Sequence, residues 1–453
     1  MAVGRRATTV TRLRVVTLLA CVLALDSANT ATIGAIAVPL RTALGIDDTQ
    51  IGLLLAASTG IGALTTLPAG LLIDKVSSRT RLLRWAIALW SVAMAISATA
   101  NSFEFLLLSR LALGAVVAIS TPAVASLLGD FVPAGERARA YGFVLTGELI
   151  GVAIGYLASG SLAEILSWRA AFVFLAIASL ALAAVLTVAL PEPQRGGHDL
   201  PDRGPGDLAT LVAAAGIRPD PGQVLTADPA NQSLWWAVRY ILRVRSNRTL
   251  IVASALGYCY LAGAQTFGVE YLRDRFTLSQ TAGTSLLVGV GLGSVLGVLA
   301  AAFTADRLIR GRVLTGRVLT CGVAFLAAAA LFTPAMLATQ FAVAVPLFTL
   351  GAAGLGAINP PLDAARLDTM PPRLRGRADG VRTVVRLALS AVGPVIFGYL
   401  ATRFDRTASA ATALSDTFIV MLLPVIAAGL LTLIWARRSY LRDIATASAG
   451  IRT

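Results

Sequence analysis

The sequence contains few of the side chains that catalysis in a soluble protein requires. Among its 453 residues are one histidine, His198, and three cysteines, and 14% of the residues are charged. About a quarter of an average soluble chain is charged. His198 lies in a polar segment, so a histidine-based triad or metal cluster within the apolar runs is excluded. The sequence also lacks the Gly-x-x-x-x-Gly-Lys-Ser/Thr loop that cradles ATP phosphates. We expect neither an enzyme nor a bound cofactor or metal.

Long apolar runs dominate what is present. The chain is 56% hydrophobic, with a mean hydropathy of +0.76. A helix needs about 20 apolar residues to cross a bilayer, and continuous runs favour helices over the alternating strands of a barrel. The sequence therefore predicts an all-α integral membrane protein with twelve transmembrane helices, at 15–38, 51–73, 82–101, 103–127, 138–160, 169–190, 249–270, 283–305, 316–334, 339–362, 380–401 and 416–436.

The basic residues predict the orientation. With the N-terminus in the cytoplasm, 31 of the 38 Lys and Arg residues lie in or near the tails and loops of that side, against 6 on the other. Cytoplasmic loops carry such an excess, so we expect a cell-membrane protein with both termini cytoplasmic. The net charge of +14 could indicate nucleic-acid binding, but the arginines are scattered between apolar runs, so no nucleic-acid partner is expected.

The predicted organisation has four parts. Residues 1–190 form the first six-helix half, 191–248 a cytoplasmic linker, 249–436 the second six-helix half and 437–453 a cytoplasmic tail. The linker begins rich in Pro, Gly and charge, which is typical of a flexible segment. Its end, SLWWAVRYILRVRSNR, has apolar residues at helical spacing interleaved with arginines. This pattern suits an amphipathic helix on the inner membrane surface. The alternative is that it forms the first turns of the seventh span.

The two halves share a sequence pattern. FVPAGERARAYG (131–142) aligns with TMPPRLRGRADG (369–380) at an offset of 238 residues. This offset pairs Pro133 with Pro371, Arg137 with Arg375, Arg139 with Arg377, Gly142 with Gly380, Pro122 with Pro360 and Asp130 with Asp368. A second match, offset by 232, pairs Asp74 with Asp306 and Lys75 with Arg307. Internal repeats of this kind are typical of transporters whose binding site lies between the repeats.

These residues resemble the major facilitator superfamily. Its motif between spans 2 and 3, Gly-x-x-x-Asp-Arg/Lys-x-Gly-x-Arg/Lys, is similar to Gly70, Asp74, Lys75 and Arg79, with Ser77 at the inner glycine. Further matches are a looser second copy at Asp306, Arg307 and Arg310, and the Arg-x-x-x-Gly pattern at Arg110 and Gly114. The resemblance implies two pseudo-symmetric six-helix halves that transport a solute by alternating access.

Within the superfamily the chain looks most like the Spinster-like branch. There an arginine in span 4 is followed twenty residues later by an aspartate, as Arg110 is by Asp130. The coupling acids of that branch are missing, because Asn29-Thr30 and Val117 stand at their positions. Lipid cargo and proton coupling therefore do not follow from the resemblance alone.

Several polar side chains lie at membrane depth, where a charge costs at least ~2.5 kcal/mol and indicates function. Asp26 lies mid-span, and helical spacing predicts that Asn29 and Thr30 share its face. Glu148 aligns with Arg386 of the second half, with Arg382 one turn earlier. We expect these residues and Arg110 to line the cavity. Glu270 and Asp363, near span ends, are weaker candidates. The alternative is that each makes a polar contact between helices, or snorkels.

The two acidic motifs predict a cytoplasmic gate. The resemblance implies that Asp74 packs against the start of span 11, here Asp379-Gly380, where free backbone N–H groups favour an acid, and Gly70 leaves room for a neighbouring helix. Arg137 is expected as a second partner of Asp74, while Lys75 and Arg79 hold the loop on its own half.

By symmetry, Asp306 is expected at the start of span 5, near Gly142, with Arg375 as its partner. The alternative is that Asp74 and Lys75 only end a helix and obey the charge rule for cytoplasmic loops.

These expectations combine into a secondary active transporter. Its energy source is expected to be the proton gradient, with Asp26 or Glu148 as the titrating group. The expected partners are protons, membrane lipids and a small amphipathic substrate, such as a lipid or a drug-like molecule, that is exported. Two alternatives remain open: facilitated uniport of a metabolite, and a membrane sensor or scaffold that transports nothing.

Overall fold

The computed structural model describes residues 2–46, 48–194, 208–225, 228–229, 232–277, 280–405 and 410–449. Throughout this part of the chain the regular secondary structure is helical. The predicted all-α fold is confirmed. Ten segments are long and apolar enough to cross a membrane. Two more helices, α3 and α11, have 28 and 32 residues. At about 1.5 Å per residue each exceeds the ~30 Å of a bilayer core, so the expected twelve spans all have a helix.

The first half contains the helices α1 (Ala2–Ala35), α2 (Ala37–Leu44), α3 (Asp48–Lys75), α4 (Arg79–Ala98), α5 (Phe103–Val117), α6 (Ser120–Phe131), α7 (Arg137–Ile165) and α8 (Trp168–Ala189). Between the halves lie two short helices, α9 (Leu208–Ala214) and α10 (Leu234–Arg243).

The second half contains α11 (Arg245–Phe276), α12 (Gln280–Arg310), α13 (Gly316–Leu337), α14 (Phe341–Gly356), α15 (Asn359–Asp368), α16 (Arg375–Asp405), α17 (Ala410–Met421), α18 (Leu423–Leu431) and α19 (Arg437–Ala449). A π-helical stretch, η4 (Thr432–Ala436), joins the last two. The residues expected as a C-terminal tail thus continue as helix to Ala449.

Two of the predicted spans are broken at equivalent places. The fourth consists of α5 and α6, and the tenth of α14 and α15. Pro122 and Pro360 follow the two breaks. Proline has no N–H to donate to the carbonyl four residues earlier, and its ring clashes with that carbonyl, so the helix bends. The repeat in the sequence is therefore repeated in the backbone geometry.

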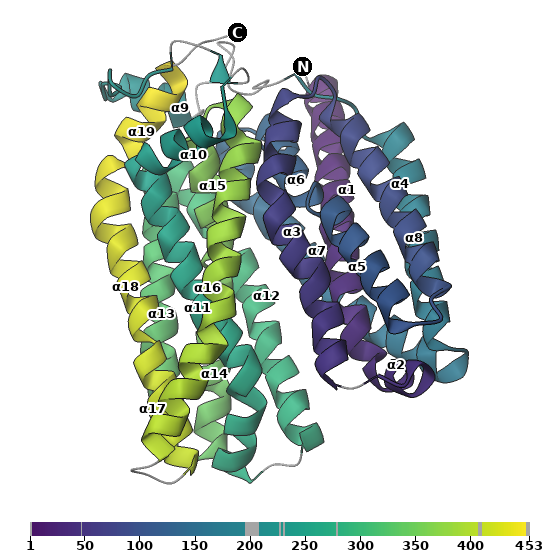
Figure 1. Ribbon diagram of the computed structural model, residues 1–453. Helices are drawn as coiled ribbons and strands as arrows, with labels where there is room; N and C mark the ends of the chain where they lie inside the picture. Colours follow the sequence, from purple (N-terminus) through teal and green to yellow (C-terminus); the bar gives the residue numbers. More distant parts are fainter. Residues whose placement is uncertain are drawn as a thin grey trace.

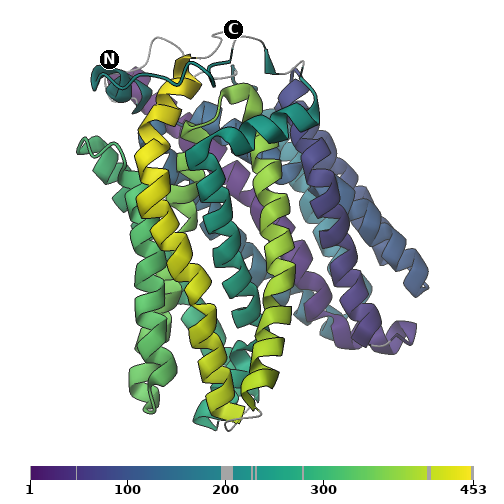
Figure 2. The same cartoon turned by 60° about the vertical axis from the view of Figure 1, so that its left-hand side comes forward.

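The two halves lie side by side, with both termini at the same end of the bundle (Figure 1). They meet at that end and diverge toward the other (Figures 1 and 2). Helices of the two halves contact each other at α3 with α16, α7 with α12, α7 with α15 and α6 with α16. A Cβ on Gly70 would lie 2.5 Å from the carbonyl oxygen of Gly376, and one on Gly142 would lie 2.6 Å from Cβ of Ala302. Glycine therefore permits the contacts of α3 with α16 and of α7 with α12.

Candidate functional site

Asp74, the next-to-last residue of α3, binds the first turn of α16 in the other half. Its carboxylate accepts hydrogen bonds from the backbone N–H of Gly376 at 3.0 Å and of Arg377 at 2.9 Å. Nε of Arg377 donates a third at 3.0 Å. The first N–H groups of a helix have no partner within the helix and carry partial positive charge. The acid satisfies them in a place where it is itself only 2% exposed.

Asp306, the counterpart of Asp74 in the repeat, makes the equivalent contact. It accepts a hydrogen bond from the backbone N–H of Arg139, in the first turn of α7, at 2.8 Å. A guanidinium from its own half, that of Arg317, lies 3.3 Å away. Each half thus places one aspartate at the start of a helix in the other half.

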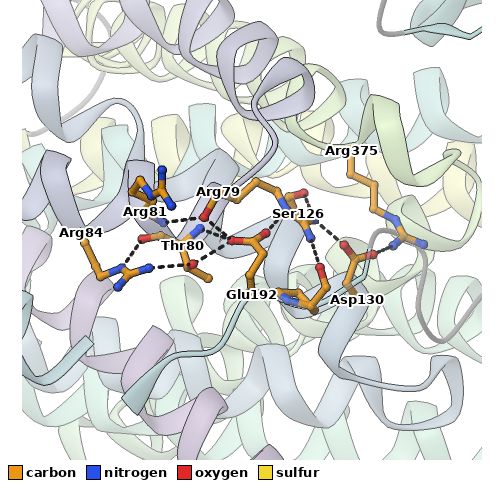
Figure 3. Close-up of polar contacts among 10 residues, drawn as sticks. Arg79, Thr80, Arg81, Arg84, Ser126, Asp130, Glu192 and Arg375 are labelled. Carbon is orange, nitrogen blue, oxygen red and sulfur yellow. Dashed lines mark hydrogen bonds and ion pairs between the residues drawn. The ribbon is translucent and has the colours of Figure 1, made fainter. Parts of the chain in front are cut away.

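A second pair of aspartates carries reciprocal ion pairs. Asp130, at the end of α6, pairs with Arg79 of its own half and with Arg375 of the other at 3.0 Å. Asp368, at the end of α15, pairs with Arg317 of its own half and with Arg137 of the other at 3.0 Å. All six side chains are buried. Figure 3 shows Asp130 between Arg79 and Arg375.

We call this region the closed end and define it by Asp74, Asp130, Asp306, Asp368 and the groups that bind them. It joins the halves at the end that carries the termini. Unpaired buried charges cost several kcal/mol, whereas here each acid has cationic or N–H partners on the opposite half, and Asp130, Asp306 and Asp368 also have an arginine partner on their own half. The four acids therefore favour contact between the halves at this end.

The arginine partners differ from those expected. Arg137 pairs with Asp368, not with Asp74, and Arg375 pairs with Asp130, not with Asp306. For Arg375 the difference follows from the start of α16, which lies at Arg375, five residues before the predicted 380. Asp74 therefore meets Gly376 and Arg377 rather than Asp379-Gly380. Successive residues of a helical turn point in different directions, so Arg375 and Arg377 reach different acids.

The remaining residues of the two acidic motifs also differ in their surroundings. Arg79 is buried and binds Asp130, whereas Lys75 and Arg307 are exposed. Lys75 therefore lies outside the buried contacts that Arg79 makes, although the sequence suggested that the two act together.

Glu192, just after α8, is a functional candidate that sequence reasoning missed. Its carboxylate accepts hydrogen bonds from N–H and Oγ1 of Thr80 at 2.8 and 2.7 Å, and from Nε of Arg79 at 3.2 Å. Figure 3 shows this arrangement beside Asp130. Burial acts to raise the pKa of Glu192, but the Thr80 hydrogen bonds and the Arg79 charge outweigh it and lower the pKa below that of an ordinary glutamate.

Three charged side chains from both halves interact deep in the bundle. Glu148 lies on α7 and Arg386 on α16, and their charges act on each other. Asp26 on α1 is within electrostatic reach of both. The Arg386 guanidinium lies 4.7 Å from the ring centre of Tyr258. All three charged side chains are half-buried. Two acids thus share one arginine across the boundary between the halves.

Arg382 belongs to a buried cluster in the second half whose charges also act on Glu148. It pairs with Asp363 at 3.1 Å, and Asp363 also binds Arg366 at 3.4 Å. Arg366 in turn lies 3.6 Å from Asp379. The cluster contains two acids and two arginines, so its charges balance internally. Asp363, a weaker candidate in the sequence, is the residue that joins the two arginines.

The remaining candidates in the first half lie on different faces. Arg110 is buried and donates to Oδ1 of Asn29 at 3.0 Å. Thr30 is exposed and donates to the backbone carbonyl of Asp26 at 3.2 Å. Asn29 therefore contacts α5, whereas Thr30 is exposed and bonds within its own helix, so the common face with Asp26 stays a prediction. The side chain of Glu270 lies outside the described residues.

Two bent, pseudo-symmetric helical halves that meet at one end define a polytopic membrane protein of the transporter class. The family model of the Major Facilitator Superfamily matches residues 18–394. The chain belongs to that superfamily.

One curated relative is a probable sphingolipid transporter, spinster homolog 1, of Arabidopsis thaliana. It is 22% identical over 344 residues, which are 73% of this chain and 68% of the relative. Three further curated relatives share 28–30% identity over only 29–40% of their own length.

Two solved structures have a similar fold. A bacterial homolog of the human lysosomal transporter Spinster, in an inward-facing and unoccupied conformation, has a TM-score of 0.58 and 19% identity, with 96% of this chain and 98% of that chain covered. The proton:xylose symporter XylE has a TM-score of 0.66 and 14% identity, with 93% and 95% covered. Spinster-like proteins therefore appear among both the curated relatives and the structural neighbours.

Proposed function

We propose that this chain is a secondary active transporter that works by alternating access and exports an amphipathic small molecule in exchange for protons. The observation that carries the proposal is the reciprocal pairing at the closed end, Asp130 with Arg375 and Asp368 with Arg137. These contacts are electrostatic and join two separate halves, so they can form in one state and break in another. With the closed end in the cytoplasm, the state described here is open to the outside.

The central charges support proton coupling. Asp26 and Glu148 carry two negative charges when ionised, and Arg386 supplies one positive charge across the boundary between the halves. The imbalance is removed when one proton, or one cationic group of a cargo, binds. Uncompensated charge is costly at membrane depth, so occupancy by a proton would depend on which face of the site is open. Such a dependence is what coupling to a gradient requires.

The cargo is proposed from the relatives. Among the curated relatives is a probable sphingolipid transporter, and the structural neighbours include a Spinster homolog. The first of these supports an amphipathic cargo, and the second has a similar fold. Facilitated uniport is the second candidate, because Asn29-Thr30 and Val117 stand where the Spinster-like branch is expected to carry its coupling acids. The plasma membrane, with both termini cytoplasmic, is the proposed location.

The test begins with a thermal-shift screen of the purified protein against lysolipids and cationic amphipaths. A molecule that stabilises the protein is then loaded into proteoliposomes with and without an imposed pH gradient. Coupled export requires flux against the cargo's own gradient that stops when a protonophore collapses the pH gradient. Flux only down the cargo gradient indicates uniport. Binding without flux under any condition indicates a sensor or scaffold and overturns the proposal.

A further inference from the structure

The short helix α10 lies crosswise at the end of the bundle that carries the termini (Figures 1 and 2). Its inner face, with Ala237 and Ile241 fully buried, packs against Ala378 and Val381 of α16. These two α16 residues lie in the first turns of a segment apolar enough to span the membrane, Pro372–Ala401. The helix α10 is therefore level with the end of the spans, where lipid headgroups lie, and runs along the plane of the membrane rather than through it.

The outer face of α10 carries a stripe of exposed side chains. Trp235 is 79% exposed, and Arg239 and Arg243 follow at intervals of four residues and are exposed as well. A fourth exposed residue, Arg248, lies in the first turn of α11. We call these four residues the basic stripe. In the described part of the chain no ion pair involves its three arginines, whereas those of the closed end are all paired.

The neighbourhood of the basic stripe keeps it positive and fixed in place. The sequence from Gln232 to Leu250 has no acidic residue. The nearby acid Asp443 is engaged by N–H and Oγ of Ser246 at 2.8 and 2.6 Å, and it feels the charge of Arg245, which is outside the stripe. Trp236 stacks on Tyr240 at 5.5 Å on the helix flank, and Tyr240 donates to the carbonyl of Gln223. The helix thus presents its outer face rigidly.

We propose that the basic stripe binds the headgroups of anionic phospholipids in the surrounding leaflet. A phospholipid satisfies both parts of the stripe: its phosphate complements the guanidinium groups, and its glycerol region and upper acyl chain cover the indole of Trp235. A free phosphate ion would leave the indole in water. A nucleic acid would need a basic surface that extends away from the membrane, whereas this stripe lies along its plane.

The first experiment measures phosphatidylglycerol binding to the full-length protein in neutral detergent, with phosphatidylcholine as the uncharged comparison. An arginine near an anionic membrane surface favours binding about fivefold. We expect Arg239→Gln/Arg243→Gln/Arg248→Gln to weaken phosphatidylglycerol binding about a hundredfold and to leave phosphatidylcholine binding unchanged. The matched control removes three exposed arginines elsewhere, in Arg81→Gln/Arg312→Gln/Arg437→Gln. An equal loss of phosphatidylglycerol affinity in the two variants would show that net charge alone explains the effect, and would overturn the proposal.

The second experiment locates the lipid through Trp235. In nanodiscs, phosphatidylglycerol with brominated acyl chains should quench the fluorescence component that is lost in Trp235→Phe, and quench it more than brominated phosphatidylcholine does. Absence of quenching would place the helix in water and contradict the proposal, as would complete displacement of phosphatidylglycerol by inorganic phosphate. Since the four side chains point outward, circular dichroism and the melting temperature of each variant should match those of the unchanged protein.

Discussion

Arg137 and Arg375, separated by 238 residues in the sequence, each pair with the aspartate that ends a bent span of the opposite half: Arg137 with Asp368 and Arg375 with Asp130, both at 3.0 Å. The two contacts are copies of each other, so either one alone still joins the halves. The closed end is therefore held by two equivalent ion pairs in addition to the two aspartate–helix contacts.

Loss of the Asp74 carboxylate should open the closed end. Asp74→Asn removes a charge-assisted contact worth roughly 1.5–3 kcal/mol, which shifts the equilibrium about ten- to a hundredfold. The measurement is the distance between spin labels at Ser77→Cys and Pro372→Cys in a background without the native cysteines. We expect a longer distance and slower turnover in a protein that still folds. Lys75→Gln, at the exposed neighbour, should leave the distribution unchanged. The same distribution in Asp74→Asn would rule out this role.

Substitutions of the two partners of one reciprocal ion pair should have non-additive effects on stability, whereas substitutions in different pairs should have nearly additive effects. Removal of one partner of a buried pair costs ~3–5 kcal/mol, because the other charge is left uncompensated. We expect the effects of Asp130→Asn and Arg375→Gln on thermal stability to be strongly non-additive. The effects of Arg137→Gln and Arg375→Gln, which belong to different pairs, should add more nearly. Full additivity in both cycles would show that the pairing contributes nothing to stability.

Asp26→Asn should abolish cargo accumulation driven by a pH gradient and leave cargo binding measurable. The substitution keeps the size of the side chain and removes the proton site. Uptake in proteoliposomes with an imposed gradient measures the effect, and Asp416→Asn, at an exposed acid of α17, is the control. If Asp26→Asn accumulates cargo normally, Glu148 becomes the candidate for the titrating group.

Glu148 and Arg386 should act on cargo affinity as one unit. Their charges interact across the boundary between the halves, so Glu148→Gln, Arg386→Gln and the double variant should give losses that do not add. We expect a coupling energy of about 0.5–3 kcal/mol from the cargo Kd values, measured at one pH and ionic strength. If the binding free energies lost in the two single variants sum to the loss in the double variant, the two residues act independently.

Glu192 should make stability fall at low pH. Its pKa in the folded protein is below the ordinary value because hydrogen bonds from Thr80 and the Arg79 charge outweigh burial. Its stabilising effect is therefore complete above the ordinary glutamate pKa and is lost as pH falls through the folded value. We expect Glu192→Gln to lower the melting temperature at neutral pH by the equivalent of ~1 kcal/mol. The difference from the unchanged protein should shrink under acid, and a constant difference would contradict this account.

Much of the fold could be predicted from the sequence, because lipid leaves the backbone few choices and the repeat fixes the symmetry. The contact of Asp74 with the start of α16 was implied by the resemblance to the superfamily, and it is favourable because an acid is stabilised at a helix N-terminus. The partner of each arginine could not be predicted. Arg137, Arg375 and Arg377 are chemically alike, and which acid each reaches depends on the residue at which α7 or α16 begins.

Glu192 was missed for a related reason. Its partners Thr80 and Arg79 lie more than a hundred residues earlier, in another helix. A lone acid in a polar stretch carries no periodicity that would connect it to them. Arg110 and Asn29 were both identified, but their contact with each other, rather than with a cavity, depends on how α1 rotates against α5.

The anchor of Asp74 is made largely of main chain, since two of its three hydrogen bonds come from the amides of Gly376 and Arg377. Every residue except proline supplies this backbone N–H, whatever its side chain. In a saturation mutagenesis of the two surfaces, replacements of Asp74 should therefore cost more than replacements of Arg377, because the first remove all three hydrogen bonds and the second only the one from Nε. Genetic suppressors of Asp74 substitutions should accordingly not be compensating changes on α16. They should arise elsewhere, as substitutions that destabilise the alternative state, in which the closed end has opened.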